Sequence, residues 1–309
     1  MSQATLQSPS ARSADFGALP QLAETSSKEN SIEMFRRMCL SRFFDEQAYQ
    51  ASKEGLLKSL IYLSAGQESI AAAISTVMSG SYIFTQHRGH APYLCFGGDL
   101  EKFIDELLGL PTGCCKGMGG SPCIQDPKIR MIGHEGLIGE HVPIAVGAAY
   151  ADRSSRVVCF FGDGAVEEDY FFGALGFAAT HKLPILFVCE DNDLSVLTPT
   201  RDRRTWQIHD IARAFGISAI DIADDPWLVQ HHAQEMSKKL PGFLNVRTCR
   251  YYWHVGAGQD GPPEWDRFAL VQEKLRAMGL GARAAAVEKE TKEHVESVWK
   301  RRLQTQSAK

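Results

Sequence analysis

The stretch from Val157 to Asn192 constrains the fold of this chain more than any other part of its sequence. An apolar run, Val157–Phe161, stops at Gly162-Asp163-Gly164. A helical pattern, from about Glu167 to His181, then leads to a second apolar run, Ile185–Cys189. Two short apolar runs joined by a helix predict a right-handed strand-helix-strand unit with parallel strands. The sequence therefore predicts an α/β protein, with three α/β/α layers around a mainly parallel sheet.

Two oxygen-bearing side chains follow these predicted strands. Asp163 comes directly after the first strand, and Asn192 comes after the second, at the end of Glu190-Asp191-Asn192. The carboxyl ends of parallel strands share one edge of the sheet, where open α/β sheets bind ligands. Carboxylate and carboxamide oxygens suit Mg²⁺, which commonly completes its shell with phosphate oxygens. The alternative is that the glycines around Asp163 form only a tight turn and that Asn192 is an ordinary loop residue.

The glycines around Asp163 favour a phosphate as the ligand. Gly162 and Gly164 let the backbone approach a ligand closely, and the following helix offers free N–H groups at its positive end. By contrast, the glycine-rich segment Lys116–Ser121 lacks the Lys-Ser or Lys-Thr ending of a nucleotide P-loop, so a P-loop is not expected there.

Length and composition limit the remaining possibilities. The chain has 309 residues, enough for one large α/β domain with extensions, and its formal net charge is −4. This charge balance argues against a nucleic-acid partner or a membrane-surface partner, and no apolar run is long enough to span a bilayer. The eight cysteines form no CxxC pair, so we expect a reducing, cytoplasmic location and no zinc cluster at Cys114, Cys115 and Cys123.

The pattern along the chain predicts three parts. Residues 1–27 are rich in small polar residues and are expected to form a flexible arm. Residues 28–262 are expected to form the α/β domain, which begins with an amphipathic helix ending near Lys53 and whose last strand lies within Phe243–Tyr252. Residues 263–309 are expected to form a helical extension, interrupted near Gly279.

Three polar segments have open interpretations at this level. His87-Arg88-Gly89-His90 could form an anion site or a solvated loop. The loop arginines Arg201, Arg203 and Arg204 could belong to a site or to exposed surface. His254 follows the last predicted strand, and a histidine in that position is more often structural than catalytic.

Several separate motifs together resemble one family, the alpha subunit of the thiamine-diphosphate-dependent 2-oxo acid dehydrogenase component, with pyruvate, branched-chain and acetoin-type members. The resemblance covers roughly residues 30–275. The motifs are Arg42-Phe43-Phe44-Asp45, Gly66-Gln67-Glu68, His87-Arg88-Gly89-His90, Lys116-Gly117-Met118-Gly119-Gly120-Ser121, Gly136-Leu137-Ile138-Gly139, the Gly162-Asp163-Gly164 to Asn192 unit, and Arg250-Tyr251-Tyr252-Trp253-His254.

The resemblance implies the diphosphate-binding type of the thiamine-diphosphate fold, with thiamine diphosphate and Mg²⁺ as cofactors. It implies that Asp163, Asn192 and the backbone carbonyl of Leu194 bind the metal. The other implied cofactor contacts are His87, Arg88, Gly136, Ile138, Gly164, Ala165 and His254. The implied catalytic residues are His254 and His90.

The chain departs from the family pattern on the substrate side. His87 stands where a tyrosine is common, Tyr252-Trp253 replaces the usual His-Gly, and Val255 stands where a serine is common. The helix after Asp163 also begins with the acidic run Glu167–Asp169, and negative charge suits a helix N-terminus. We therefore expect cofactor binding to be retained and the substrate or acceptor to be unusual.

The resemblance also implies a reaction and its partners. The family decarboxylates a small 2-oxo acid and transfers the acyl group, and the glutamate that activates the cofactor belongs to a separate beta subunit. We expect an α2β2 assembly and a lipoyl acyltransferase as acceptor. Two alternatives remain: a thiamine-diphosphate acyl or ketol transferase with a non-lipoyl acceptor, and a weakly active subunit for assembly or regulation.

Overall fold

The protein is described from a computed structural model, which covers residues 12–57, 59–133, 136–259 and 261–307. Six strands form one sheet in the order β2-β1-β3-β4-β8-β7, and every neighbouring pair is parallel. The strands are β1 (Tyr82–Phe84), β2 (Met131–Ile132), β3 (Val157–Gly162), β4 (Ile185–Asp191), β7 (Ser218–Ala223) and β8 (Gly242–Arg247).

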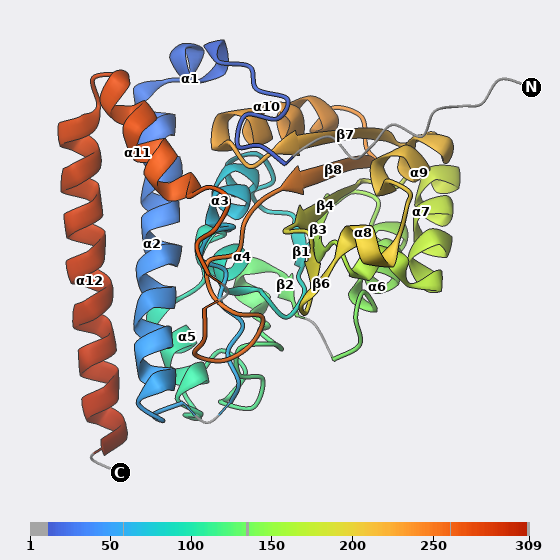
Figure 1. Ribbon diagram of the computed structural model, residues 1–309. Coiled ribbons are helices and arrows are strands. Elements are labelled where there is room, and N and C mark those ends of the chain that lie inside the picture. The colour runs from blue at the N-terminus through green and yellow to red at the C-terminus, as the bar shows by residue number, and fades with distance from the viewer. Residues whose placement is uncertain (1–11, 58, 134–135, 260, 308–309) are drawn as a thin grey trace, which may run out of the picture.

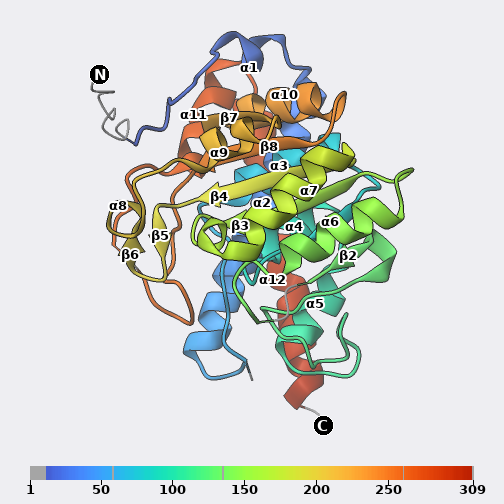
Figure 2. The ribbon, with the colours of Figure 1, turned by 90° about the vertical axis from the view of Figure 1, so that its right-hand side faces the viewer.

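Helices cover both faces of this sheet (Figures 1 and 2). The helices of the described residues are α1 (Gln21–Thr25), α2 (Lys28–Lys53), α3 (Glu68–Val77), α4 (His90–Cys95), α5 (Leu100–Leu107), α6 (His141–Ala151), α7 (Asp169–His181), α8 (Thr200–Arg203), α9 (Ile208–Ala214), α10 (Pro226–Ser237), α11 (Arg267–Ala277) and α12 (Gly281–Ser307). Single 3₁₀ turns occupy Pro127–Ile129 and Ala165–Glu167, and a small antiparallel hairpin pairs β5 (Leu194–Ser195) with β6 (Thr198–Pro199).

The sheet separates two hydrophobic cores, because successive side chains of a strand point to opposite faces. Val158 and Phe160 of β3 join the core under α2, α3, α4 and α10. Cys159 and Phe161 join the core under α6, α7 and α9. Strands buried on both faces appear in the sequence as continuous apolar runs. The predicted three-layer α/β/α fold is therefore confirmed.

The C-terminal helices pack on the long N-terminal helix. Figure 1 shows α12 running beside α2, with α11 packed against both near their upper ends. Trp299 of α12 is 1% exposed and lies 5.6 Å from the ring of Phe44. The predicted helical extension, residues 263–309, thus shares its core with the α/β domain over its described part.

The predicted flexible arm needs correction over residues 12–27. The Phe16 carbonyl accepts a hydrogen bond from the backbone N–H of Ala223 at 2.9 Å, and Arg267 donates to the Ala14 carbonyl at 2.5 Å. Arg12 pairs with Glu264 and donates to the Thr248 carbonyl. These partners lie far away in the sequence, so the polar composition of the segment gave no sign of them. Residues 1–11 lie outside the described residues.

The last strand is also shorter than predicted. The strand expected within Phe243–Tyr252 ends at Arg247, and the chain then crosses over Gly66. The backbone N–H of Tyr251 donates to the Ala65 carbonyl at 2.9 Å. A Cβ atom on Gly66 would lie 2.2 Å from the Cys249 carbonyl oxygen, and Gly66 has φ +100°. Only glycine permits this crossing, which carries the chain from the sheet toward His254.

Candidate active site

The strand-helix-strand unit brings Asp163 and Asn192 to neighbouring strand ends. β3 and β4 pair in parallel with Gly162 opposite Glu190, so the chain turns out of the sheet at the same edge in both strands. Both residues line one cavity at that edge. The structure thus brings the two residues together, and the common ligand expected from the sequence stays a prediction.

Most of the predicted site residues line this same cavity. The lining includes His87, Arg88, Ile138, Asp163, Gly164, Ala165, Asn192, Leu194 and His254. Gly139 and Gly162, which belong to motifs noted in the sequence, also line it. The residues that the sequence did not single out are Gln86, His141, Ser195 and Val196. The β5–β6 hairpin supplies one wall, and the segment after β1 supplies the wall that carries His87 and Arg88.

Asp163 is deeply buried and engaged by a cation. Its side chain is 1% exposed, and its Oδ2 accepts hydrogen bonds from the guanidinium of Arg203 and, at 3.3 Å, from the hydroxyl of Thr200. Burial raises the pKa of Asp163 to about 6, and the nearby Asp191 carboxylate adds to the rise, whereas Arg203 and Arg204 oppose it. The guanidinium of Arg203 therefore strongly stabilises the negative charge of this buried carboxylate.

The loop arginines divide into two that reach the site and one that does not. Arg203 and Arg204 donate to the same oxygen, Oε1 of Glu167, at 2.5 Å and 2.6 Å, and Arg204 also donates to the Asp163 carbonyl at 2.6 Å. Arg201 is exposed. The acidic start of the helix after Asp163 thus has a partner in this loop, a pairing that no periodicity in the sequence reveals.

The Gly66-Gln67-Glu68 motif supports the site from the other side. Asn192 donates from Nδ2 to Oε1 of Gln67 at 2.8 Å, while its Oδ1 accepts from the backbone N–H of Leu194 at 3.1 Å. Gln67 is fully buried, so it fixes which way the Asn192 amide faces. Gly66 permits the crossing of the chain, and Glu68 pairs with buried Arg42 at 2.5 Å.

Arg88 is buried in the cavity wall and ties two segments together. Its Nη1 donates to the Leu63 carbonyl at 2.5 Å, and its Nη2 donates to the His254 carbonyl at 3.3 Å. The rings of Tyr62, His87 and His254 also cluster, with centroids 4.7 to 5.6 Å apart. A forked guanidinium beside two imidazoles is a suitable binding surface for an anion such as a diphosphate.

Glu190 is a buried acid beside the cavity. Its side chain accepts a hydrogen bond from Nε2 of Gln86 at 2.7 Å. Burial raises the pKa of Glu190 to about 7, while the Gln86 hydrogen bond and the charge of Arg88 act in the opposite direction. In the sequence Glu190 could be noted only as part of a strand end, because its partner Gln86 lies in the segment after β1, far away along the chain.

Two predicted residues do not reach the cavity. His90 is fully buried, with Nδ1 2.6 Å from Asp45 and Nε2 2.7 Å from the Ser121 hydroxyl. Asp45 also accepts backbone N–H groups of the Ser64 segment, so His90 holds loops together, and we replace its expected catalytic role with a structural one. Gly136, with φ +131°, is exposed and lies outside the cavity lining. Its neighbour Glu135 lies outside the described residues.

The donor set fits a magnesium diphosphate. Asp163, Asn192 and the Leu194 carbonyl offer hard oxygen ligands of the kind that Mg²⁺ prefers. Gly164 packs closely against the β5–β6 hairpin, since a Cβ there would lie 2.7 Å from the Ser195 hydroxyl. Arg88 lines the same cavity, and a guanidinium is a group that commonly binds phosphate oxygens.

Comparison with known proteins decides the family. The family model for the dehydrogenase E1 component matches residues 35–260. The chain belongs to the dehydrogenase E1 component family. It is 30% identical over 266 residues to the alpha subunit of acetoin:2,6-dichlorophenolindophenol oxidoreductase from Bacillus subtilis, covering 82% of this chain and 80% of that protein. The resemblance inferred from the motifs is thereby confirmed.

Other E1 relatives agree with this assignment. The pyruvate dehydrogenase E1 alpha subunit of Rickettsia felis is 30% identical over 239 residues, covering 74% of this chain and 73% of that protein. A transketolase from Campylobacter jejuni superposes with a TM-score of 0.57 at 16% identity, covering 90% of this chain. The chain spans 49% of that transketolase, and this likeness concerns the fold alone.

Proposed function

We propose that this E1 chain is the alpha subunit of a heteromeric enzyme that uses thiamine diphosphate and Mg²⁺ to decarboxylate a small 2-oxo acid and transfer the acyl group, with a lipoyl carrier as acceptor. The observation that carries the proposal is the cavity at the carboxyl ends of β3 and β4. It brings the oxygen donors Asp163 and Asn192 together with Arg88 and His254.

Each residue has a distinct task in this proposal. Asp163, Asn192 and the Leu194 carbonyl hold the metal, and the backbone of Gly164 and Ala165 faces the diphosphate. Arg88 holds the diphosphate oxygens with His87 beside it. When bound, the cofactor supplies a nucleophilic carbon for attack on the keto group and release of carbon dioxide.

The remaining walls of the cavity serve orientation and proton transfer. Ile138 lines the cavity and is assigned to the aminopyrimidine side, with Gly136 nearby in the chain. The Ile138 carbonyl is fixed by the hydroxyl of Tyr170, which donates to it. His254 lines the cavity beside His87 and is assigned to proton transfer at the reacting atoms.

A second subunit is needed for the activating carboxylate. Among the described residues, the acids at the cavity are already engaged: Asp163 and Glu167 by arginines, and Glu190 by Gln86. The neighbouring helices α6 and α7 also carry exposed apolar side chains, including Ile144, Tyr150 and Phe177. An exposed apolar face of this kind suits subunit contact, and we assign it to an α2β2 assembly.

The location proposed is the cytoplasm, since all eight cysteines are free thiols. Within the described residues, no helix is both long and apolar enough to cross a membrane.

A second candidate keeps the cofactor but changes the acceptor. Trp253, next to His254, is 47% exposed and replaces a glycine that is common at this position. A bulky exposed indole next in the chain to the cavity-lining His254 favours an acceptor other than a swinging lipoyl arm. In that case the chain serves an acyl or ketol transferase of a specialised pathway. A weakly active assembly subunit would bind cofactor without supporting turnover.

The experiment that tests the proposal is co-purification of the chain with its partner, followed by a 2-oxo acid screen with an artificial electron acceptor. We expect decarboxylation by the assembled complex and none by the chain alone. A lipoyl domain is then compared with free aldehydes as acceptor, which separates the two transfer reactions. Turnover by the chain alone would contradict the two-subunit proposal, and cofactor binding by an inactive complex would favour the assembly role.

A further inference from the structure

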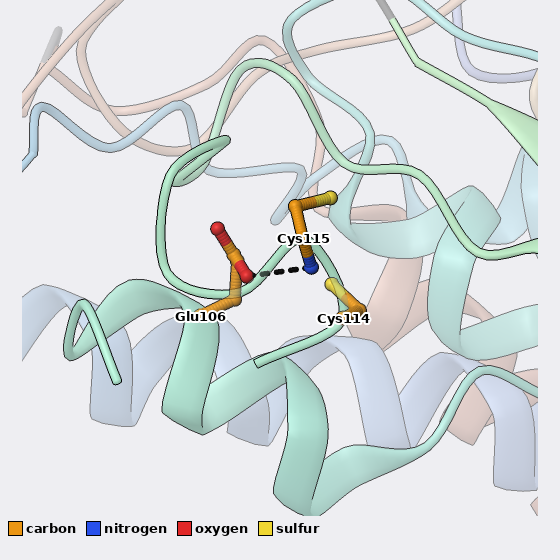
Figure 3. Close-up of side chains that lie close together, drawn as sticks. All are labelled: Glu106, Cys114 and Cys115. Carbon is orange, nitrogen blue, oxygen red and sulfur yellow. Dashed lines mark hydrogen bonds between the residues drawn. The ribbon is translucent and has the colours of Figure 1, made fainter. Parts of the chain in front are cut away.

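The loop between α5 and Ser121 contains a side-chain cluster that resembles a metal site, but its carboxylate is occupied by hydrogen bonds from the loop backbone. Glu106, Cys114 and Cys115 place one carboxylate oxygen and two sulfur atoms within 4.8 Å of one another (Figure 3). Yet Oε2 of Glu106 accepts the backbone N–H groups of Cys115 and Gly117 at 2.7 and 2.9 Å. A metal bound by this oxygen would have to replace these hydrogen bonds.

The other carboxylate oxygen of Glu106 is equally occupied. Oε1 accepts the backbone N–H groups of Gly119 and Gly120 at 2.8 and 3.0 Å. Four backbone donors thus saturate a buried carboxylate, which explains how this glycine-rich loop keeps its shape. Glu106 is a loop-holding residue, and the chemistry left in the cluster belongs to the two thiols.

The two thiols differ in character although they are neighbours in the chain. The Cys114 thiol donates a hydrogen bond to Cys115, which lowers the pKa of Cys115 and raises the pKa of Cys114. The backbone N–H of Gln125 also points at the Cys115 sulfur, at 3.1 Å. Cys115 is partly exposed, so a small oxidant can reach it. As a thiol, Cys115 donates to the carbonyls of Cys123 and Gln125, both at 3.4 Å. Once deprotonated, its sulfur accepts from the Gln125 N–H and lies within 4.8 Å of the Cys114 sulfur, which is the arrangement of a reactive dithiol.

We propose that Cys114 and Cys115 form a redox-active dithiol that hydrogen peroxide or an organic hydroperoxide oxidises reversibly to a disulfide between adjacent residues. The Cys115 thiolate attacks the peroxide oxygen, takes up one oxygen atom as a sulfenic acid, and releases water or an alcohol after protonation. The Cys114 thiol then attacks the sulfenic sulfur, the S–S bond forms, and a second molecule of water leaves.

The position of the pair favours easy reversal. Adjacent Cα atoms lie about 3.8 Å apart, whereas the Cα atoms of most disulfides are about 4.4 to 6.8 Å apart. A disulfide between neighbours is therefore strained and easily reduced, as is typical of labile rather than structural bridges. The loop that carries it ends at Ser121, whose hydroxyl accepts the backbone N–H of Tyr62 and contacts His90.

The other cysteines provide internal references. Cys39, Cys95, Cys159 and Cys189 are buried, and burial raises the pKa of each thiol. Cys123 is the rival partner, because the Cys115 thiol donates to its carbonyl at 3.4 Å. Trypsin separates the candidates: cleavage at Lys102, Lys116 and Lys128 leaves Cys114 and Cys115 on one peptide and Cys123 on the next.

The test is tryptic mass spectrometry of the full chain after treatment with one equivalent of hydrogen peroxide. We expect the peptide 103–116 to become lighter by about 2 Da, for the loss of two hydrogen atoms, and to recover its mass with dithiothreitol. We also expect iodoacetamide to modify Cys115 at least about tenfold faster than Cys39. A cross-linked pair of peptides 103–116 and 117–128 would overturn the proposal, as would equal alkylation rates.

Three serine variants test the division of roles. Cys115→Ser removes the oxidation, whereas Cys114→Ser leaves a sulfenic acid on Cys115 that dimedone traps. The matched control Cys123→Ser keeps the mass loss in peptide 103–116. Failure of dimedone to label Cys114→Ser, or loss of the disulfide in Cys123→Ser, would contradict the assigned roles.

Discussion

The guanidinium of Arg203 lies against the Asp163 carboxylate, the residue assigned to the metal. The two side chains are 9% and 1% exposed, so water screens their attraction only weakly. Arg203 also contacts Glu167 at 2.5 Å and comes from the segment that follows the β5–β6 hairpin. A metal ion that binds Asp163 must therefore compete with a cation of the protein itself.

This competition predicts the effect of Arg203→Gln. Removing the guanidinium frees Asp163 while Arg204 still holds Glu167, so we expect Mg²⁺ to bind the cofactor-loaded complex about tenfold more tightly, equivalent to about 1.4 kcal/mol. The measurement is a Mg²⁺ titration by isothermal calorimetry. Arg201→Gln, a change at an exposed arginine of the same segment, is the matched control and should leave the affinity unchanged. Weaker Mg²⁺ binding by Arg203→Gln would mean that Arg203 assists the metal.

Arg88→Lys is expected to weaken thiamine diphosphate binding although it keeps the charge. Lysine cannot reproduce the forked hydrogen bonds of a guanidinium, and losing one charge-assisted hydrogen bond costs about 1.5–3 kcal/mol, or about one to two decades in affinity. Calorimetric titration with the cofactor measures this change, and the exposed Arg36→Lys serves as control. An unaltered dissociation constant for Arg88→Lys would remove Arg88 from the site.

The buried pair of Arg42 and Glu68 predicts a large loss of stability. Arg42→Met leaves the Glu68 carboxylate buried without its ion partner, which typically lowers the free energy of unfolding by about 3–5 kcal/mol. Urea denaturation at neutral pH measures the loss. Arg36→Met breaks the exposed pair with Glu290 and should change stability by less than about 1 kcal/mol. Similar effects of the two substitutions would show that burial does not determine how much the Arg42–Glu68 pair contributes to the free energy of unfolding.

Burial of Glu68 also determines how the stability lost in Arg42→Met depends on pH. Desolvation raises the pKa of Glu68 above its usual range. A carboxyl group whose pKa is raised in the folded state binds a proton more readily when folded than when unfolded, so stability is greater at low pH and is lost as the pH rises through the raised value. The positive charge of Arg42 opposes this rise, so in Arg42→Met the pKa of Glu68 is raised further. The destabilisation by Arg42→Met should therefore shrink as the pH is lowered from 7 to 5.

The alkylation rate of Cys115 should reach half of its maximum at a lower pH than that of an ordinary cysteine. The hydrogen bond from Cys114 stabilises the thiolate and holds the pKa of Cys115 below its usual range. The rate therefore rises through the lowered pKa, and Cys114→Ala should move the midpoint upward. Rates of iodoacetamide labelling across pH 6 to 10 give both midpoints, and a midpoint unaffected by Cys114→Ala would contradict the assigned hydrogen bond.

The sequence predicted the parts of the protein that depend on local periodicity. The strand-helix-strand unit from Val157 to Asn192 could be predicted, because its apolar runs and glycines alone specify two parallel strands and their ligand-binding ends. The positions of Arg203 and Arg204 could not be predicted, because their partners are determined by how the loop after β4 folds back. The roles of Gly66 and His90 depend likewise on segments that meet only in the folded chain.

The most direct test of the proposed cofactor site is calorimetric titration of the assembled complex with thiamine diphosphate and Mg²⁺, using Asp163→Asn and Asn192→Ala. Asp202→Ala, at an exposed residue of α8, is the control, and thermal unfolding verifies that each variant is folded. We predict that both site variants lose Mg²⁺-dependent cofactor affinity by at least about tenfold, while Asp202→Ala binds like the wild type. Wild-type affinity in both folded site variants would contradict the assignment of this cavity to the metal diphosphate.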